Sequence, residues 1–192
     1  EAWSADNEPY VPSLRASEWR LGRQFVSEEV AAIHAADPAA RPVSINHAQH
    51  FVFDRRWTWA LEDSDALGAS LYPFRNVKPF GLHFAFPILE LGPLQANYAD
   101  QARKAHAQGK PFWITELGAE PWSDGDIRLI STAKTFDDLT PERFRKNIDY
   151  ARRTGADVVY LWGSEWWLYQ KQIRGNDVWW ELGRQAIAGE IR

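Results

Sequence analysis

The chain has 192 residues, a formal net charge of −4 at pH 7 and no cysteine. One domain of this length can bury a sizeable core. The mild acidity argues against a nucleic-acid binder, which usually carries a basic stripe, and no run of about 18 apolar residues marks a membrane segment. Without cysteine, disulfides and thiol catalysis are excluded.

Short apolar runs alternate with helical patterns along the chain. The expected strands are residues 1–6, 42–46, 66–72, 112–115 and 158–162. The expected helices are residues 17–36, 94–108, 140–154 and 177–188, with a weaker helical signal at 57–61. Strands that alternate with helices predict a parallel sheet with helices packed on it, so we expect one α/β domain over residues 1–192.

Residues 73–93 interrupt this rhythm. They are rich in phenylalanine, leucine and proline. We interpret them as a long strand-to-helix loop, with room for a short helix, that is too hydrophobic to be disordered.

Polar side chains follow the expected strands at the ends where parallel strands meet. Glu8 follows the first strand, His47 the second, Glu116 the fourth and Glu165 the fifth, and Tyr72 ends the third. Two carboxylates at the ends of separate strands suit the cleavage of glycosidic bonds, in which one protonates the leaving group and the other attacks the sugar. The alternative for any one glutamate is a solvated strand end or a helix cap.

Two motifs shift this balance toward chemistry. Asn7-Glu8-Pro9 resembles the acid/base motif of clan A glycoside hydrolases, and residues 113–118 (Trp-Ile-Thr-Glu-Leu-Gly) resemble their nucleophile motif. The cellulase-like family 5 is the nearest resemblance, and it covers the whole chain as strands 4 to 8. It implies a partial (β/α)₈ TIM barrel of about five parallel strands with outer helices. In a retaining enzyme of this kind, Glu8 is the general acid/base, Glu116 is the nucleophile, and their carboxyls lie about 5–5.5 Å apart.

The same resemblance implies further roles. Asn7 hydrogen-bonds the sugar 2-hydroxyl, Tyr72 hydrogen-bonds Glu116, and Trp162 forms a platform under the sugar. His47 either lines the cleft or is a structural histidine, and the sequence favours neither.

Other residues on the same loops are weaker candidates. Trp122 and Glu165 are predicted to contact substrate, and Trp166 and Trp167 offer further sugar subsites. For Glu165, however, a solvated charge at the rim is the favoured explanation. Glu120 lies further along its loop, where it contacts substrate or solvent.

We predict neither a metal nor a cofactor. His47 and His50 have no third ligand at useful spacing, and the sequence shows no glycine-rich phosphate loop and no nucleophile elbow. The expected partner is a carbohydrate, and we expect neither nucleic acid nor membrane as a partner. A polysaccharide substrate would associate the chain with an extracytoplasmic location, which nothing in the sequence fixes.

The resemblance lacks its first three strands. The absence of methionine and the strand-like opening at Glu1–Ala5 predict a piece of a longer chain. We therefore expect either N-terminal strands from elsewhere or self-association to cover the open sheet edges, and the isolated piece to be a weak or inactive enzyme. The competing functions are a non-catalytic carbohydrate-binding barrel and a self-associating half-barrel.

Overall fold

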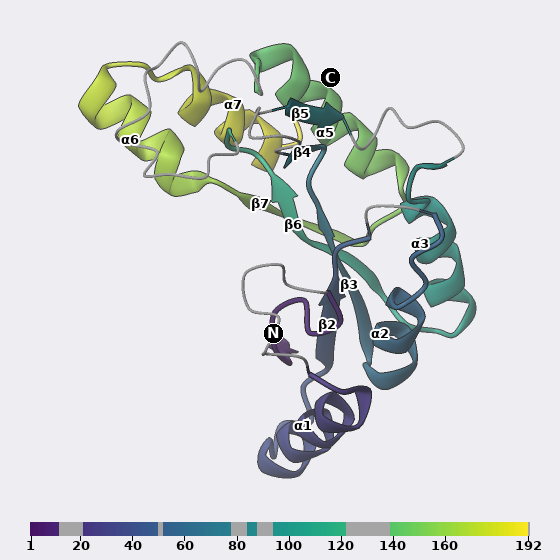
Figure 1. The fold of residues 1–192 in the computed structure, drawn as a ribbon. Helices are drawn as coiled ribbons and strands as arrows, with labels where there is room; N and C mark the ends of the chain where they lie inside the picture. Colours follow the sequence, from purple (N-terminus) through teal and green to yellow (C-terminus); the bar gives the residue numbers. More distant parts are fainter. Residues whose placement is uncertain (12–20, 50–51, 78–83, 88–93, 122–138, 192) are drawn as a thin grey trace.

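The computed structural model describes residues 1–11, 21–49, 52–77, 84–87, 94–121 and 139–191, with only the backbone for 74–77 and 84–87. Its main sheet has five parallel strands in the order β1-β2-β3-β6-β7, which is also their order along the chain (Figure 1). They are β1 (Trp3–Ser4), β2 (Val43–His47), β3 (Ala66–Leu71), β6 (Phe112–Gly118) and β7 (Val158–Trp162). The sheet curls as part of a barrel, which confirms the predicted α/β class and its five parallel strands.

Four helices connect successive strands of this sheet. They are α1 (Arg23–Ala36), α2 (Trp57–Asp63), α3 (Tyr98–Ala107) and α5 (Pro141–Arg153). Figure 1 shows α2 and α3 side by side along one side of the sheet, and α7 (Val178–Ile187) follows further along the chain. The weak signal at 57–61 is confirmed as α2, whereas α1 begins at Arg23, later than expected, and residues 17–20 lie outside the described part.

Two segments differ from the prediction. Within the expected loop 73–93, β4 (Phe74–Val77) and β5 (Phe84–Pro87) form an antiparallel pair. This segment is apolar in sequence, but its backbone N–H and C=O groups still need hydrogen-bond partners. Pairing between two strands supplies more of these partners than an irregular loop does. Helix α6 (Ser164–Arg174) was not predicted, because its tryptophans obscure the helical period; Gly163, at φ 130°, makes the turn from β7 into it.

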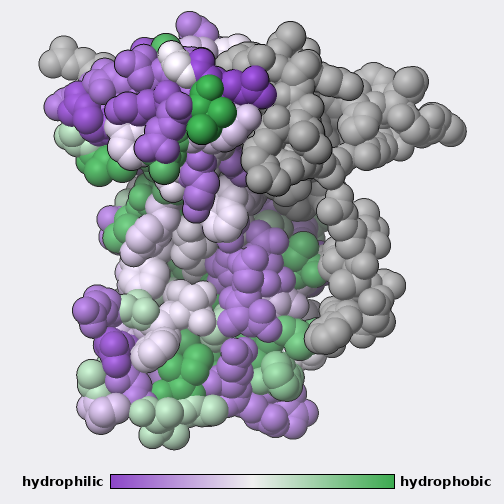
Figure 2. All heavy atoms as spheres, turned by 90° about the vertical axis from the view of Figure 1, so that its left-hand side faces the viewer, coloured by the Kyte–Doolittle hydropathy of each residue, from purple (hydrophilic) through white to green (hydrophobic). Residues whose placement is uncertain are grey.

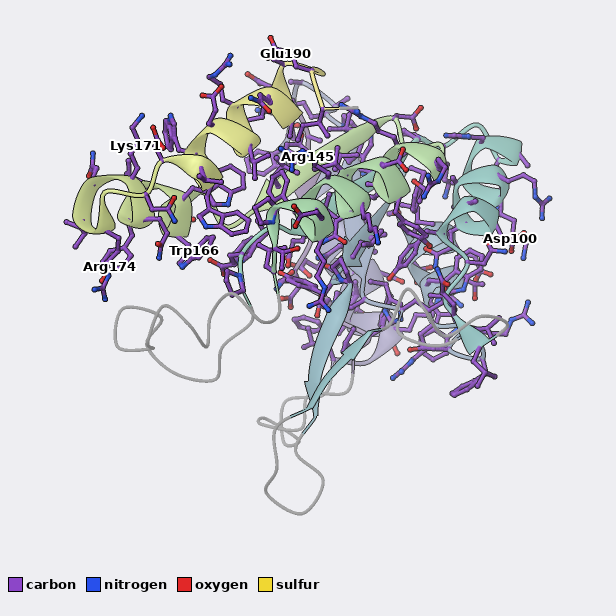
Figure 3. The ribbon with its side chains drawn as sticks, turned by 90° about the horizontal axis from the view of Figure 1, so that it is seen from above. Asp100, Arg145, Trp166, Lys171, Arg174 and Glu190 are labelled. Carbon is purple, nitrogen blue, oxygen red and sulfur yellow. The ribbon has the colours of Figure 1, made fainter. Side chains whose placement is uncertain are left out.

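The tryptophans after β7 belong to the core and not to sugar subsites. Trp166 and Trp179 are buried with ring centroids 5.0 Å apart, and Phe144 of α5 packs on Trp179 at 6.4 Å. Trp167 is buried as well, and its indole N–H donates to the Ala119 carbonyl at 2.7 Å. In Figure 3, Trp166 points toward the body of the molecule, whereas Lys171 and Arg174 on the same helix point away. The suggested subsites at Trp166 and Trp167 are therefore wrong.

Aspartates fasten the first residues of two strands. Asp65 accepts the Val43 N–H at 2.8 Å and lies 2.8 Å from His34 Nε2, so it ties the start of β2 to α1. Asp157 repeats this arrangement at the start of β6, where it contacts His106 of α3 at 2.9 Å. Both clamps lie at the strand ends opposite to those that carry Glu8 and Glu116. They fix the strand register from which the functional side chains project.

Asp37 anchors the short first strand. Its carboxylate accepts the Trp3 indole N–H at 2.9 Å and two bonds from Arg41, each at 2.9 Å. Hydrogen bonds from Arg41, then from Trp3, hold the Asp37 pKa well below its ordinary value. The lowered folded-state pKa means that this contribution to stability is present above the ordinary aspartate pKa of about 3.9 and is lost as the pH falls below it.

Asp37→Asn is therefore expected to lower the urea midpoint of unfolding at pH 7, because the amide keeps the shape but loses the charge-assisted bonds. The gap between wild type and variant should narrow between pH 4 and pH 2. Asp149→Asn, which removes an exposed pair with Arg153, is the control and should change the midpoint little. An equal loss for both variants would contradict the anchoring role.

The described part of the surface shows unpaired strand edges and exposed hydrophobic side chains, both of which bear on binding partners. Among the described residues, β1 and β7 each pair on one side only, and Tyr160 and Trp162 of β7 are 57% and 52% exposed. On the face seen in Figure 2, hydrophobic residues lie in small separate groups between polar ones. No helix in the described ranges is long and apolar enough to cross a membrane.

Candidate active site

Glu8 sits in a tight turn directly after β1. Asp6 and Glu8 both adopt positive φ values, 41° and 51°, which side chains other than glycine rarely take. The Asn7 N–H donates to Asp6 Oδ1 at 2.7 Å, and the Glu8 N–H donates to Asn46 Oδ1 at 2.9 Å. Side-chain acceptors thus hold a backbone shape that costs about 1–3 kcal/mol at each such residue.

Glu116 lies within β6, at an irregularity in the sheet. Ala69 pairs with Ile114, but the next residue of β3, Ser70, pairs with Glu116, so Thr115 is the extra residue of a bulge. The pairing of β6 with β7 shifts over the same stretch. Bulges re-aim side chains and are common beside active sites. The bulge therefore explains how a residue inside a strand presents its carboxylate at the site.

Tyr72 joins Glu116 to the rest of the site. Its hydroxyl donates to Glu116 Oε2 at 2.5 Å, which is the contact that the sequence predicted. Burial raises the Tyr72 pKa most, followed by Glu116, and the charges of Glu8 and Glu120 raise it further. Tyr72 therefore stays protonated at neutral pH and remains a donor. The charges of Glu8, Glu116 and Glu120 thus all raise the pKa of one hydroxyl.

Gly118 makes room for Tyr72. A Cβ atom at position 118 would stand 2.8 Å from Tyr72 Cδ1 and 3.3 Å from its Cε1. A Cβ this close to Tyr72 would have to displace the ring, and the bond from its hydroxyl to Glu116 would be disturbed with it.

Gly118→Ala is accordingly expected to lower kcat by roughly 10- to 100-fold, since small misplacements at a reacting centre carry costs of that size. Gly22→Ala is the matched control, because nothing lies within 4 Å of its added Cβ. The comparison is of kcat for the reaction proposed below, with the melting temperature of each variant. If both variants kept full kcat, Tyr72 would not need its present position.

Glu120 follows β6 and contacts Trp162, the last residue of β7. Trp162 ends β7 and is 52% exposed, as a sugar platform would be. Burial, and secondarily the charge of Glu165, raise the Glu120 pKa, and a hydrogen bond from the Trp162 side chain opposes that rise. Gly163 passes close behind, since a Cβ there would lie 2.7 Å from Glu120 Cβ. Glu120 thus faces Trp162, a contact that its place in the loop did not reveal.

Of the other residues predicted to contact the substrate, Asn7 lies beside Glu8, Glu165 lies at the start of α6, and Trp122 is not described. Asn7 is exposed beside Glu8, with its Oδ1 held by Asn46. Glu165 is exposed at the start of α6, where the Ser164 hydroxyl lies 3.3 Å from its Oε2. Trp122 lies outside the described residues.

His47 is fully buried, and its Nε2 lies 3.3 Å from Asp54 Oδ2. This is the environment of a packed histidine, one of the two alternatives that the sequence left open. His50, its proposed companion in a metal site, lies outside the described residues. Within the described ranges, no group of three or more histidine, aspartate or glutamate side chains is arranged to hold a metal ion.

Asn46 is a site residue that the sequence reasoning missed. It lies in β2 and is almost fully buried, yet it contacts both Asn7 and the backbone of Glu8. The sequence does show a polar amide inside an expected strand, which indicates a side chain with specific hydrogen-bond partners. Its partners lie about 40 positions earlier in the chain, at a spacing that no local pattern encodes.

No protein-family model matches the chain, and no curated protein matches it. Among solved structures, it is similar to a β-glucuronidase from Ruminococcus gnavus in complex with D-glucuronic acid, with a TM-score of 0.49 and 17% identity over 85% of this chain and 25% of that one. It is also similar to a β-glucuronidase from Bifidobacterium dentium complexed with coumarin-3-O-glucuronide, with a TM-score of 0.41 and 18% identity over 84% of this chain and 24% of that one. The chain therefore spans about a quarter of the length of these proteins. Similarity at this level assigns neither a family nor a substrate.

Proposed function

We propose that this chain carries the catalytic carboxylates of a retaining glycoside hydrolase that acts on β-linked poly- or oligosaccharides. The observation that supports this best is the 2.5 Å bond from Tyr72 to Glu116, made by a hydroxyl whose pKa also responds to the charge of Glu8. A carboxylate held by a neutral phenol, with a second carboxylate whose charge acts on the same phenol, supports a double displacement.

The proposed reaction assigns one role to each carboxylate. Glu116 attacks the anomeric carbon and forms a glycosyl ester, while Glu8 gives its proton to the departing oxygen. Glu8 then removes a proton from water, which attacks the same carbon from the face that the leaving group vacated and releases Glu116. Two inversions at one carbon give overall retention.

Tyr72 contributes to the proposed reaction through Glu116. Its bond holds one carboxylate oxygen in place, which leaves the other to attack. Asn7 and Trp162 are proposed to contact the sugar, the first at the 2-hydroxyl and the second under the ring face, where C–H groups suit a flat aromatic surface. Membership of family 5 stays a prediction. We propose neither the sugar nor its linkage, because loop shape chooses them.

The competing function is a carbohydrate-binding barrel without catalysis. The short Tyr72–Glu116 contact disfavours it, since binding alone gives no reason to fix the orientation of one carboxylate oxygen. A binding module would also need no second carboxylate beside the same hydroxyl.

The test is hydrolysis of a panel of aryl β-glycosides by the full chain, with the anomeric configuration of the first product followed by proton NMR. The β-anomer should appear first and mutarotate afterwards. An initial α-anomer would overturn the retaining mechanism. Binding without hydrolysis would favour the non-catalytic alternative only once the edges of β1 and β7 are paired, because the chain with open edges is expected to be weak or inactive.

We also propose that further strands or a second copy of the chain pair with β1 and β7. The unpaired edges of these two strands, within the described residues, support this. Light scattering distinguishes the two sources, because self-association raises the mass above the 22.1 kDa of one chain.

A further inference from the structure

Asn46 is the most fully bonded polar side chain beside Glu8. It is 3% exposed, and burying an amide is unfavourable unless its atoms find partners. Its Oδ1 accepts the Glu8 N–H at 2.9 Å, and its Nδ2 lies 2.9 Å from Asn7 Oδ1 and 3.1 Å from Ser70 Oγ. The amide thus uses both of its ends within the site.

The neighbouring strand is built to admit this side chain. Gly68 is the register partner of Asn46 on β3, and a Cβ at position 68 would stand 2.9 Å from both the Cα and the Cβ of Asn46. A larger residue at 68 would push Asn46 away from the turn. Glycine at position 68 therefore leaves the space that the Asn46 side chain occupies.

The polarity of the network follows from one donor that cannot be reversed. A backbone N–H only donates, so the atom of Asn46 that faces Glu8 must be its oxygen. The other end of Asn46 is then the NH₂ group, and the Asn7 atom that faces it must be an acceptor, Oδ1. Asn7 consequently has its own NH₂ group left to offer to a ligand.

We propose that Asn46 is a positioning residue that holds the backbone of Glu8 in its positive-φ turn and fixes Asn7 as a hydrogen-bond donor. This inference rests on the proposed function, because it concerns the acid/base arm of that reaction. Through Ser70, which lies two residues before Tyr72, Asn46 also ties the turn of Glu8 to the strand of Tyr72. The two carboxylates are therefore spaced by polar side chains as well as by the sheet.

Two substitutions separate the two roles. Asn46→Ala removes the acceptor for Glu8 and the donor for Asn7. Asn46→Asp keeps an acceptor for the Glu8 N–H but offers no donor, so Asn7 would turn its amide over and present oxygen to the ligand. Asn147→Ala, at another buried asparagine on α5, controls for the general cost of losing a buried amide.

The first readout needs no catalysis. Hydrogen exchange of the Glu8 amide, followed by NMR in the full chain, should be at least about 10-fold faster in Asn46→Ala than in wild type and nearly unchanged in Asn46→Asp and Asn147→Ala. Unchanged exchange in Asn46→Ala would overturn the positioning of Glu8, whatever the activity.

The second readout is the dependence of kcat/KM on the leaving group. Asn46→Ala, which displaces the acid/base, should lower kcat/KM roughly 10- to 100-fold for an alkyl glycoside and under about 3-fold for a dinitrophenyl glycoside. Glu8→Ala should show the same dependence on the leaving group, with larger losses. Asn46→Asp should lower kcat/KM for glucosides but much less for their 2-deoxy analogues. If kcat/KM fell by the same factor for all substrates in both variants, Asn46 would have only a structural role. If Glu8→Ala itself showed no leaving-group dependence, the proposed function would fail, and the amide exchange would still decide the role of Asn46.

Discussion

Replacing Glu116 with alanine is expected to lower kcat by roughly 10⁴–10⁶, the range seen when the nucleophile of a covalent mechanism is removed. No glycosyl ester can form without the carboxylate, so substrates with good and poor leaving groups should suffer alike. Tyr72 would lose its acceptor in the same variant, which adds to the loss. The measurement is the steady-state rate on a dinitrophenyl and an alkyl glycoside, which should fall by similar factors.

Azide provides the internal check on this role. It can occupy the space that the Glu116 side chain vacates and attack from that face, giving a glycosyl azide of inverted configuration. Tyr72→Phe is the companion variant, because it keeps the nucleophile and removes only the 2.5 Å bond. Its loss should be smaller, and azide should not restore it. A Glu116→Ala protein with nearly normal turnover would exclude Glu116 as the nucleophile.

Local patterns in the sequence were sufficient for the main sheet and its strand order. Apolar runs of strand length identified all five strands of the main sheet, and the helix expected over residues 140–154 is α5, which begins at Pro141 after its cap Thr140. Strand ends also led to the prediction that Glu8 and Glu116 lie near each other, because parallel strands end at one edge, and this stays a prediction.

The sequence could not reveal contacts that depend on strand register. Asn46 contacts Glu8, which lies 38 positions away in the sequence, and Gly118 lies against Tyr72 across the β3–β6 pair. Contacts between such distant positions produce no local sequence pattern. The bulge at Thr115 is equally hidden, although it sets the direction of Glu116.

Tryptophan misled the sequence reasoning in one region. Position beside a strand end suggested sugar subsites at Trp166 and Trp167, but both side chains are buried in the core. Trp162, in contrast, is half exposed. The difference follows from helix α6, whose first turn directs two large rings inward, and only the packing of α6 against α5 and α7 decides that.

Replacing Glu8 with alanine tests the other half of the mechanism, and its expected effect depends on the leaving group. Loss of general acid catalysis costs roughly 10²–10⁴ where the departing oxygen needs a proton. A dinitrophenolate leaves without that help, so formation of the glycosyl ester should be largely spared. Hydrolysis of the ester should remain slow, because the base that activates water has also gone. A burst of phenolate followed by a slow steady state is the signature to look for in stopped-flow absorbance.

Azide again separates the roles, with the opposite stereochemistry. It is an anion that needs no base, so it should attack the accumulated ester of Glu8→Ala from the leaving-group face and give a glycosyl azide of retained configuration. Retention in this variant and inversion in Glu116→Ala follow from which face of the sugar each carboxylate serves. Glu165→Ala is the control, since its exposed carboxylate begins α6 and should show neither the burst nor the rescue. If Glu8→Ala gave the inverted azide and Glu116→Ala the retained one, the two assignments would have to be exchanged, because azide reports the face that each missing carboxylate left open.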